Sequence, residues 1–156
     1  MIRAMTEADW EAAKRVMPMS LKEDTRGVAS VDPETGELWG CVVCEDWTVT
    51  AVCCHIVIND MRKAVRDRIF TEVADYVFNQ GGRIKILGTV PADNPAAVSV
   101  NKKIGFREIF RIEEGYDWGI DYIIMELRKE DCPYWIPREN IDGQEVTESA
   151  RLRIAS

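Results

Sequence analysis

The segment NPAAVSVNKKIGF, residues 94–106, decides the fold. Its first residue, Asn94, is of a type that caps helices, and Pro95 follows at the first helical position, where a missing N–H costs no hydrogen bond. Gly105 is the residue type that most often ends a helix in the left-handed conformation. The segment therefore predicts a capped helix that runs to about Ile104, followed by a strand that begins at Phe106.

A longer amphipathic helix is expected upstream, between two strands. Apolar residues recur four apart at Val65, Ile69, Val73 and Val77, and two glycines follow at 81 and 82. The flanking segments 49–58 and 83–90 have the composition and alternation of strands. A helix over residues 64–80 between two strands predicts a βαβ unit, which is parallel and right-handed.

The remaining elements surround this unit. We expect a short strand at 2–4, a helix at 8–17, strands at 28–31 and 38–45, and a final hairpin of strands 106–112 and 121–127 around a loop at 113–119. These elements predict one domain over residues 1–128. Residues 129–156 are polar and contain Pro133 and Pro137, so we expect a C-terminal extension that packs on the domain or on a second copy in a homodimer.

Composition argues against several functional classes. A net charge of -7 and a pI of about 4.8 repel phosphate backbones, so we expect no nucleic-acid partner, whereas a cationic substrate is attracted. No apolar run approaches the ~20 residues of a membrane span, and the N-terminal residues have no signal-peptide pattern. The sequence therefore predicts a cytoplasmic protein without membrane contact.

The five cysteines are expected to be reduced, because their number is odd and no export signal precedes them. Cys41 and Cys44 lie three apart in a predicted strand, so their side chains point to opposite faces. Cys53 and Cys54 are adjacent and face the same difficulty. We therefore expect buried structural cysteines and no metal, and a cysteine-based metal or redox protein is the weakest alternative.

The element order and the opening segment resemble the GNAT N-acyltransferases. The last helix of that family typically has the pattern N-x-x-A-x-x-apolar-Y-x-K-x-G-F, and its register is matched here by Asn94, Ala97, Val100, Lys103, Gly105 and Phe106. Asn101 replaces the tyrosine. The lead-in from Val90 to Asn94 is similar to that of GNAT domains from phages. The resemblance implies an α/β GNAT fold, with a mixed, mostly antiparallel sheet and a central parallel βαβ splay.

The resemblance also implies an acyl-CoA co-substrate, acetyl-CoA. Its pantetheine arm would lie along Val57, Ile58 and Asn59 and along residues 87–90, where Gly88 allows a close approach. A backbone N–H of Val57 or Ile58 would polarise the thioester carbonyl. Asn94 and Lys103 are expected to contact the same co-substrate because they match the family motif.

The pyrophosphate is expected at the start of the long helix, where N–H groups and the helix dipole favour an anion. Arg62, Lys63 and Arg66 would hold it by their side chains. Val65 and Asp67 depart from the family pattern, which has small residues at both positions. These two residues hinder a close approach of phosphate to the backbone, and Asp67 adds repulsion.

Acetyl transfer requires a base for the amine and an acid for the leaving thiolate. His55, the only histidine, is the candidate base, with Glu45 and Asp46 as acidic alternatives. Asn101 occupies the position of the usual acid but has no suitable pKa, so Tyr116 or Tyr122 is the possible substitute. Acidic residues in the loop at 113–119 would suit a cationic amine acceptor.

The predicted function is therefore transfer of an acetyl group from acetyl-CoA to an amine of a small molecule or protein. The alternative is a GNAT-fold protein without catalysis, acting as a binding, regulatory or virion-associated module. Val65, Asp67 and Asn101 favour this alternative, because each replaces a residue that the family uses for the co-substrate or the chemistry.

Overall fold

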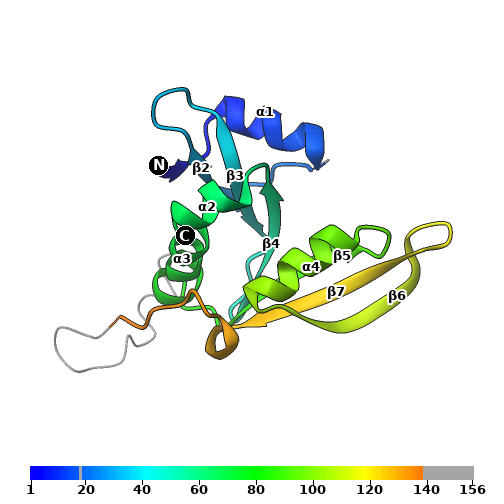
Figure 1. Cartoon of the computed structure of the whole chain (residues 1–156). Helices are drawn as coiled ribbons and strands as arrows, with labels where there is room; N and C mark the ends of the chain where they lie inside the picture. Colours follow the sequence, from blue (N-terminus) through cyan, green and yellow to red (C-terminus); the bar gives the residue numbers. More distant parts are fainter. Residues whose placement is uncertain (18, 139–156) are drawn as a thin grey trace. The chain divides into compact units, whose positions relative to one another are not determined.

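The computed structural model describes residues 1–17 and 19–138, and residues 139–156 of the predicted extension lie outside the described residues. The chain forms two compact units (Figure 1). One contains Met1–Trp47 and Cys53–Val73, and the other contains Thr48–Val52 and the described residues from Ala74 onward. Within the described residues, no helix is long and apolar enough to cross a membrane.

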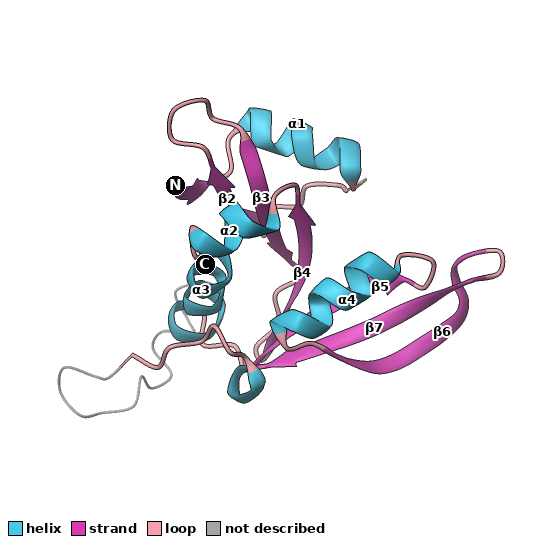
Figure 2. Cartoon of the chain, viewed as in Figure 1, coloured by secondary structure: helices cyan, strands magenta, loops and turns pink. Residues whose placement is uncertain are grey.

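Seven strands form a mixed sheet, as expected from the sequence, and their order in it is β1-β2-β3-β4-β5-β7-β6 (Figure 2). The strands are β1 Ile2–Ala4, β2 Arg26–Val31, β3 Leu38–Glu45, β4 Ala51–Ile58, β5 Lys85–Pro91, β6 Arg107–Asp117 and β7 Ile120–Arg128. The pairs β1–β2, β2–β3, β3–β4, β5–β7 and β6–β7 are all antiparallel. The predicted strands are thus confirmed, with small differences at their ends except for β6, which continues well beyond its predicted end.

The first unit has its core beside helix α1, Glu7–Val16. The side chain of Asp9 accepts hydrogen bonds from the Thr6 backbone N–H at 2.8 Å and from its hydroxyl at 2.7 Å, which fixes the start of α1. The buried core residues are Ala13 of α1 with Ala29, Val31, Cys41 and Val57 of the strands. Burial of this apolar face holds α1 on strands β2 to β4.

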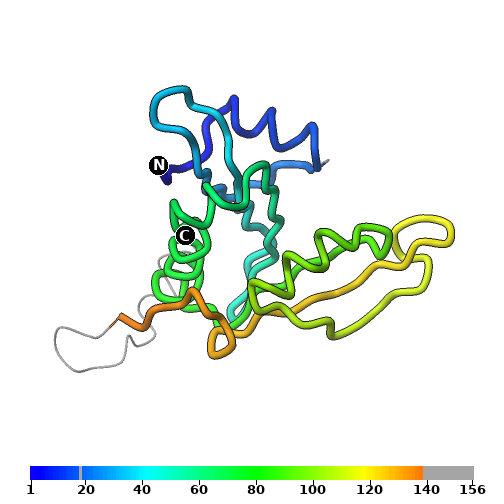
Figure 3. Tube along the Cα trace, viewed as in Figure 1, coloured from blue at the N-terminus to red at the C-terminus, as the bar shows by residue number. Residues whose placement is uncertain are grey.

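The long helix expected over residues 64–80 is broken in the structure, so that prediction is wrong in its continuity (Figure 3). The segment forms α2 Met61–Arg66, α3 Ile69–Ala74 and a π-helix, η1, Asp75–Gln80. The Asp67 carboxylate accepts a hydrogen bond from the Ser30 hydroxyl at 2.7 Å and lies 2.8 Å from the Met1 ammonium. These contacts hold a turn at Asp67, and Arg68 adopts a positive φ of 68° that interrupts the helix.

The second unit is built from β5, β7 and β6, with helix α4, Pro95–Ile104, packed on them. As predicted, the Asn94 side chain accepts a hydrogen bond from the Ala97 N–H at 3.1 Å, and Gly105 ends the helix with a φ of 113°. The buried core residues of this unit include Val77, Phe78, Ile86, Val90, Ile104, Phe106, Ile123, Met125 and Leu127. Helix α4 is therefore fixed at both ends and along its inner face.

The loop expected at residues 113–119 is mostly strand, which corrects that prediction. Strand β6 continues to Asp117, and only Trp118 and Gly119 separate it from β7. Glu114 has a positive φ of 47° within an irregular part of the register. The Asp121 carboxylate accepts from the Glu114 N–H at 3.1 Å, and the Glu114 carboxylate accepts from the Gly119 N–H at 2.8 Å. These bonds supply partners for backbone groups that the irregular register leaves unpaired.

Candidate functional site

The structure joins His55 to Glu45 in the first unit. His55 lies on β4 and Glu45 at the end of β3, and the His55 Nε2 to Glu45 Oε1 distance is 2.8 Å. Both side chains are largely buried, with 24% and 13% of their surfaces exposed. Since a carboxylate only accepts hydrogen bonds, this contact assigns the imidazole N–H to Nε2. The Nδ1 lone pair is then available to accept a proton, and no described residue hydrogen-bonds to it.

The charged side chains of Lys22 and Asp46 lie beside the Glu45–His55 pair. The Lys22 Nζ lies 2.6 Å from Asp46 Oδ1 and 3.9 Å from Glu45 Oε2. Glu45 thus contacts the imidazole on one oxygen and approaches an ammonium with the other. The two residues that the sequence offered as acidic alternatives to His55 are therefore its partner, Glu45, and its neighbour in the cluster, Asp46.

The cysteines of the first unit form no nucleophilic site. Burial raises the pKa of the Cys53 thiol, which lies opposite Glu45 in the strand register. The Cys44 and Cys54 sulfurs lie 3.3 Å apart, and this contact, together with burial, raises the pKa of Cys54. All five cysteines are free thiols, and all except the half-buried Cys53 are buried. The predicted burial is thus confirmed for four of the five cysteines.

The segment predicted to bind pantetheine belongs to the end of β4. Val57 is buried in the core of the first unit. Asn59 donates its backbone N–H to the Trp39 carbonyl at 2.9 Å and its side-chain amide to the Leu38 carbonyl at 3.0 Å. Ile58 pairs with Gly40 across the sheet. This end of β4 is therefore anchored to β3, which makes its backbone a rigid surface.

The three cations predicted to bind phosphate lie on α2. Arg62 and Arg66 are exposed and form no ion pair with any described residue. The Lys63 Nζ lies 5.3 Å from the Trp39 ring centroid and 3.8 Å from a carboxylate oxygen of both Glu37 and Asp60. The Asp60 carboxylate also accepts the Lys63 N–H at 3.0 Å. A negative charge thus occupies the start of this helix, and only the outer arginines are free to meet an anion.

The predicted residues of the second unit have separate surroundings. Asn101 is buried on α4, with its side-chain nitrogen 3.7 Å from the Met125 sulfur. Tyr116 is exposed on β6, and its ring centroid lies 5.6 Å from that of Tyr122. The Tyr122 hydroxyl accepts a hydrogen bond from Thr89 at 2.9 Å. Asn101 thus contacts a thioether, and Tyr116 contacts only the neighbouring Tyr122 ring in the contacts described for these two side chains.

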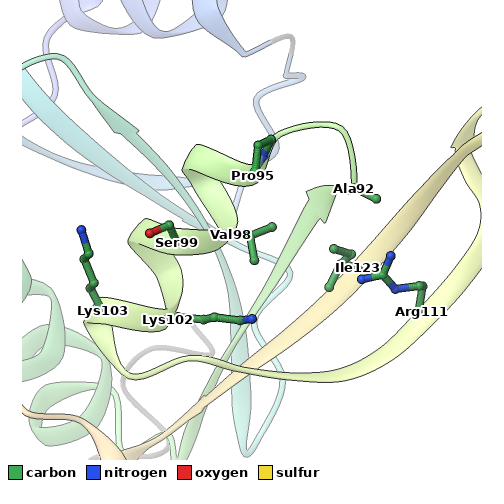
Figure 4. Close-up of a pocket in the computed structure, with 8 residues that line it drawn as sticks. All are labelled: Ala92, Pro95, Val98, Ser99, Lys102, Lys103, Arg111 and Ile123. Carbon is green, nitrogen blue, oxygen red and sulfur yellow. The ribbon is translucent and has the colours of Figure 1, made fainter.

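A pocket of about 600 Å³ opens beside α4 (Figure 4). It is lined by Ala92, Pro95, Val98, Ser99, Lys102, Lys103, Arg111 and Ile123. Of these residues, only Lys103 was singled out from the sequence. The spacing of Val98 and Lys102, four apart on a helix, shows that they share a face, but nothing in the sequence brings Arg111 to that face.

The described part of the chain contains no group of three or more His, Cys, Asp or Glu side chains arranged to hold a metal ion.

No protein-family model matches the chain, and no curated protein matches it. Solved structures do match it. A mutant of the spermidine N-acetyltransferase SpeG from Vibrio cholerae superposes with a TM-score of 0.68 at 18% identity, covering 83% of this chain and 95% of that chain.

Two further SpeG structures from Vibrio cholerae agree. The spermidine/spermine N-acetyltransferase in complex with manganese ions gives a TM-score of 0.66 at 18% identity, with 83% of this chain and 92% of that chain covered. Another SpeG mutant gives a TM-score of 0.67 at 20% identity, with 83% of this chain and 94% of that chain covered. The fold is thus the GNAT acetyltransferase fold that the segment 94–106 indicated.

Proposed function

We propose that this protein is an acetyl-CoA-dependent N-acetyltransferase that acts on an amine of a small molecule or protein. The observation that carries the proposal is the Glu45–His55 pair, which lies on the strands of a GNAT fold. A histidine whose Nε2–H is held by a carboxylate is oriented to accept a proton at Nδ1, and an imidazole is the side chain that most often acts as a general base.

The proposed reaction uses this pair as the base. The ammonium form of the acceptor loses a proton to His55 Nδ1, and the free amine attacks the acetyl carbonyl of acetyl-CoA. The attacking nitrogen then loses its extra proton to water and the carbon–sulfur bond breaks. The thiolate of CoA takes up a proton, which gives the amide and the free thiol. Asn101 is a poor acid, so we assign the protonation of the thiolate to water or to the protonated His55.

The co-substrate residues remain part of the proposal. A backbone N–H of Val57 or Ile58 would polarise the thioester carbonyl, since the anchored end of β4 holds it in a fixed position. Arg62 and Arg66 would supply charge to the phosphates because they are exposed and unpaired among the described residues. Asn59, Lys63, Asn94 and Lys103 are the other proposed contacts.

Spermidine is the first acceptor to test, because it is the acceptor named for the structural neighbours. The net charge of -7 also favours a cationic acceptor. The experiment incubates the chain with acetyl-CoA and spermidine, amino acids, aminoglycosides or peptides, and measures the free thiol released. A thermal shift with acetyl-CoA alone tests binding of the co-substrate.

The His55→Gln variant tests the base. We expect its kcat to fall by about a hundredfold or more, with the thermal shift from acetyl-CoA unchanged. The Glu45→Gln variant should lower kcat less, because it loses only the orientation of the imidazole. Glu11→Gln, which changes an exposed carboxylate on α1, is the matched control and should retain full activity. If His55→Gln retains the kcat of the parent, His55 is not the general base.

The second candidate is a GNAT-fold protein without catalysis, such as a binding, regulatory or virion-associated module. Two observations favour it: the buried amide of Asn101 at the tyrosine position, and the Asp60 carboxylate at the start of α2. This candidate predicts that no amine in the panel yields a free thiol. The absence of any thermal shift with millimolar acetyl-CoA would sink the acetyltransferase proposal altogether.

A further inference from the structure

The pocket beside α4 joins an apolar floor to a cationic rim. Its apolar members are Ala92, Pro95, Val98 and Ile123, and its cations are Lys102, Lys103 and Arg111, with the hydroxyl of Ser99. All eight residues belong to the second unit. Figure 4 shows Lys102 extending from α4 toward the side where Ile123 and Arg111 lie, whereas Lys103 extends to the other side of the helix.

The charge of this pocket is opposite to that of the chain. Acidic residues outnumber basic ones 27 to 20 in the sequence, yet three of the eight lining residues are basic and none is acidic. Because the net charge of the chain is negative, a local group of cations marks a place where an anion is attracted.

The cations of the rim have different roles. The Arg111 guanidinium is held by Glu108, at 3.1 and 3.3 Å, and lies 3.6 Å from Asp121. These carboxylates fix its position and offset its charge. Lys102 and Lys103 form no ion pair with any described residue, although the Glu108 carboxylate is close enough to Lys102 to interact with it electrostatically. Their ammonium groups are therefore less tightly paired than the Arg111 guanidinium.

We propose that this pocket binds a small organic anion with an apolar body, either a carboxylate or a phosphate ester. The Lys102 ammonium would meet the anionic group, while Val98 and Ile123 cover the apolar body. A volume of about 600 Å³ suits a ligand of this size. Lys102 favours a ligand of negative charge, and the apolar floor favours an organic anion over a fully hydrated inorganic ion.

This inference does not rest on the Glu45–His55 pair, which belongs to the first unit, and it shares only Lys103 with the residues proposed for acetyl-CoA. Its test therefore uses the full chain without acetyl-CoA. Benzoate, phenyl phosphate, benzylamine and inorganic phosphate are titrated separately into labelled protein, and the backbone amide resonances of Val98, Lys102 and Ile123 are followed by NMR. The first three probes share one apolar ring and differ in their charged group.

We expect benzoate or phenyl phosphate to shift these resonances saturably, and the stronger of the two identifies the anionic group. Benzylamine should leave them unchanged because its charge is repelled by Lys102, and inorganic phosphate should bind more weakly because it has no apolar body. Equal shifts with benzylamine would overturn the proposal, as would no shift with either aromatic anion at millimolar concentration.

Variants separate the pocket from general surface charge. Lys102→Glu should weaken binding of the better anion by about tenfold or more, since it replaces attraction by repulsion at the rim. Lys14→Glu makes the same change on α1 of the first unit and should leave the affinity unchanged. Equal affinities for the two variants would contradict an anion site at Lys102. Both lysines are surface residues, and a thermal melt confirms that each variant is folded.

Discussion

Glu126 shows how one buried carboxylate is stabilised at the residue scale. It accepts hydrogen bonds from Lys85 at 2.8 Å, from Arg107 at 2.9 Å and from Arg128 at 3.2 Å. Strand pairing creates this cluster, because Arg107 lies opposite Glu126 and Lys85 lies opposite Arg128. The hydrogen bond from Lys85, followed by that from Arg107, lowers the pKa of Glu126 to about 2.

This lowered pKa predicts how stability depends on pH. The ordinary pKa of the group is 4.5, so its contribution is fully present above that value and is lost as the pH falls toward about 2. Glu126→Gln should lower the free energy of unfolding at neutral pH by about 1–3 kcal/mol. The difference from the parent should shrink between about pH 5 and pH 2 in urea unfolding.

The control is Glu130→Gln, because Glu130 is an exposed carboxylate 3.7 Å from Arg128. Its substitution should change the free energy of unfolding by less than about 1 kcal/mol at any pH. A loss in Glu126→Gln that stays constant down to pH 2 would show that the ionised carboxylate is not what stabilises the fold.

Some residues of the candidate sites could be predicted from the sequence, and others could not. His55 could be selected because it is the only histidine, and Glu45 because it is an acidic residue near the same turn. Their hydrogen bond depends on the register between β3 and β4. The sequence of the turn at residues 46–50 does not determine that register. Lys102 and Arg111 come from different elements, so their shared pocket required the tertiary structure.

At the scale of elements, Gly105 tests why α4 ends where it does. A Cβ at this position would lie 3.0 Å from the Asp131 carbonyl oxygen and 3.0 Å from a methyl carbon of Leu127. Gly105→Ala should therefore lower the free energy of unfolding by about 2–4 kcal/mol, because the left-handed backbone and the crowded Cβ both disfavour alanine.

Gly119→Ala is the matched control, since Gly119 also has a positive φ, 70°, but a Cβ there meets no atom within 4 Å. Gly119→Ala should lower the free energy of unfolding by only about 1–2 kcal/mol, since only the backbone conformation disfavours alanine there. Urea unfolding of both variants measures the two costs. Equal losses would mean that the backbone conformation alone, and not the packing behind α4, restricts position 105.

Elements were predicted well where their signals are local. Helix α4 is an example, because its cap, its proline and its glycine all lie within the segment itself. The continuous helix expected at 64–80 was not predicted well. Its break at Asp67 is held by a hydrogen bond from Ser30, which lies 37 residues away in the chain. The irregular end of β6 likewise depends on side chains of the turn and of β7, and its polar composition suggested a loop.

At the scale of the whole molecule, the burial of the cysteines makes a prediction. Cys53 is half-buried and the other four thiols are buried, so one of the five should react with a thiol reagent in the native protein. All five should react after denaturation. Cys53→Ser should abolish the native reaction, whereas Cys132→Ser should leave it unchanged. Rapid reaction of two or more native thiols would contradict the described packing.

The whole fold was the easiest level to predict, because the order of strands and helices along the chain limits the possible topologies. The candidate site was harder, because its residues come from several strands and helices. Burial of Asn101 and the capping of α2 by Asp60 are properties of packing that composition does not reveal.

The exposed strand β6 has a consequence for the chain in concentrated solution. All eleven of its residues are exposed, including Ile109 and Phe110, and within the described residues it pairs with β7 alone. A long open edge with apolar side chains is a template for another strand. A second copy is the proposed occupant, because antiparallel pairing about the midpoint of residues 108–111 would set Glu108 of one chain opposite Arg111 of the other.

We therefore expect a homodimer that extends the sheet across two chains and forms with increasing concentration. Sedimentation equilibrium should show a weaker association for Phe110→Lys, because the new charge repels its copy across the edge. Val49→Lys changes an equally exposed apolar residue elsewhere and should associate like the parent. If the parent is monomeric at all concentrations, β6 is protected by its own twist and charge, and the edge remains closed to further strands.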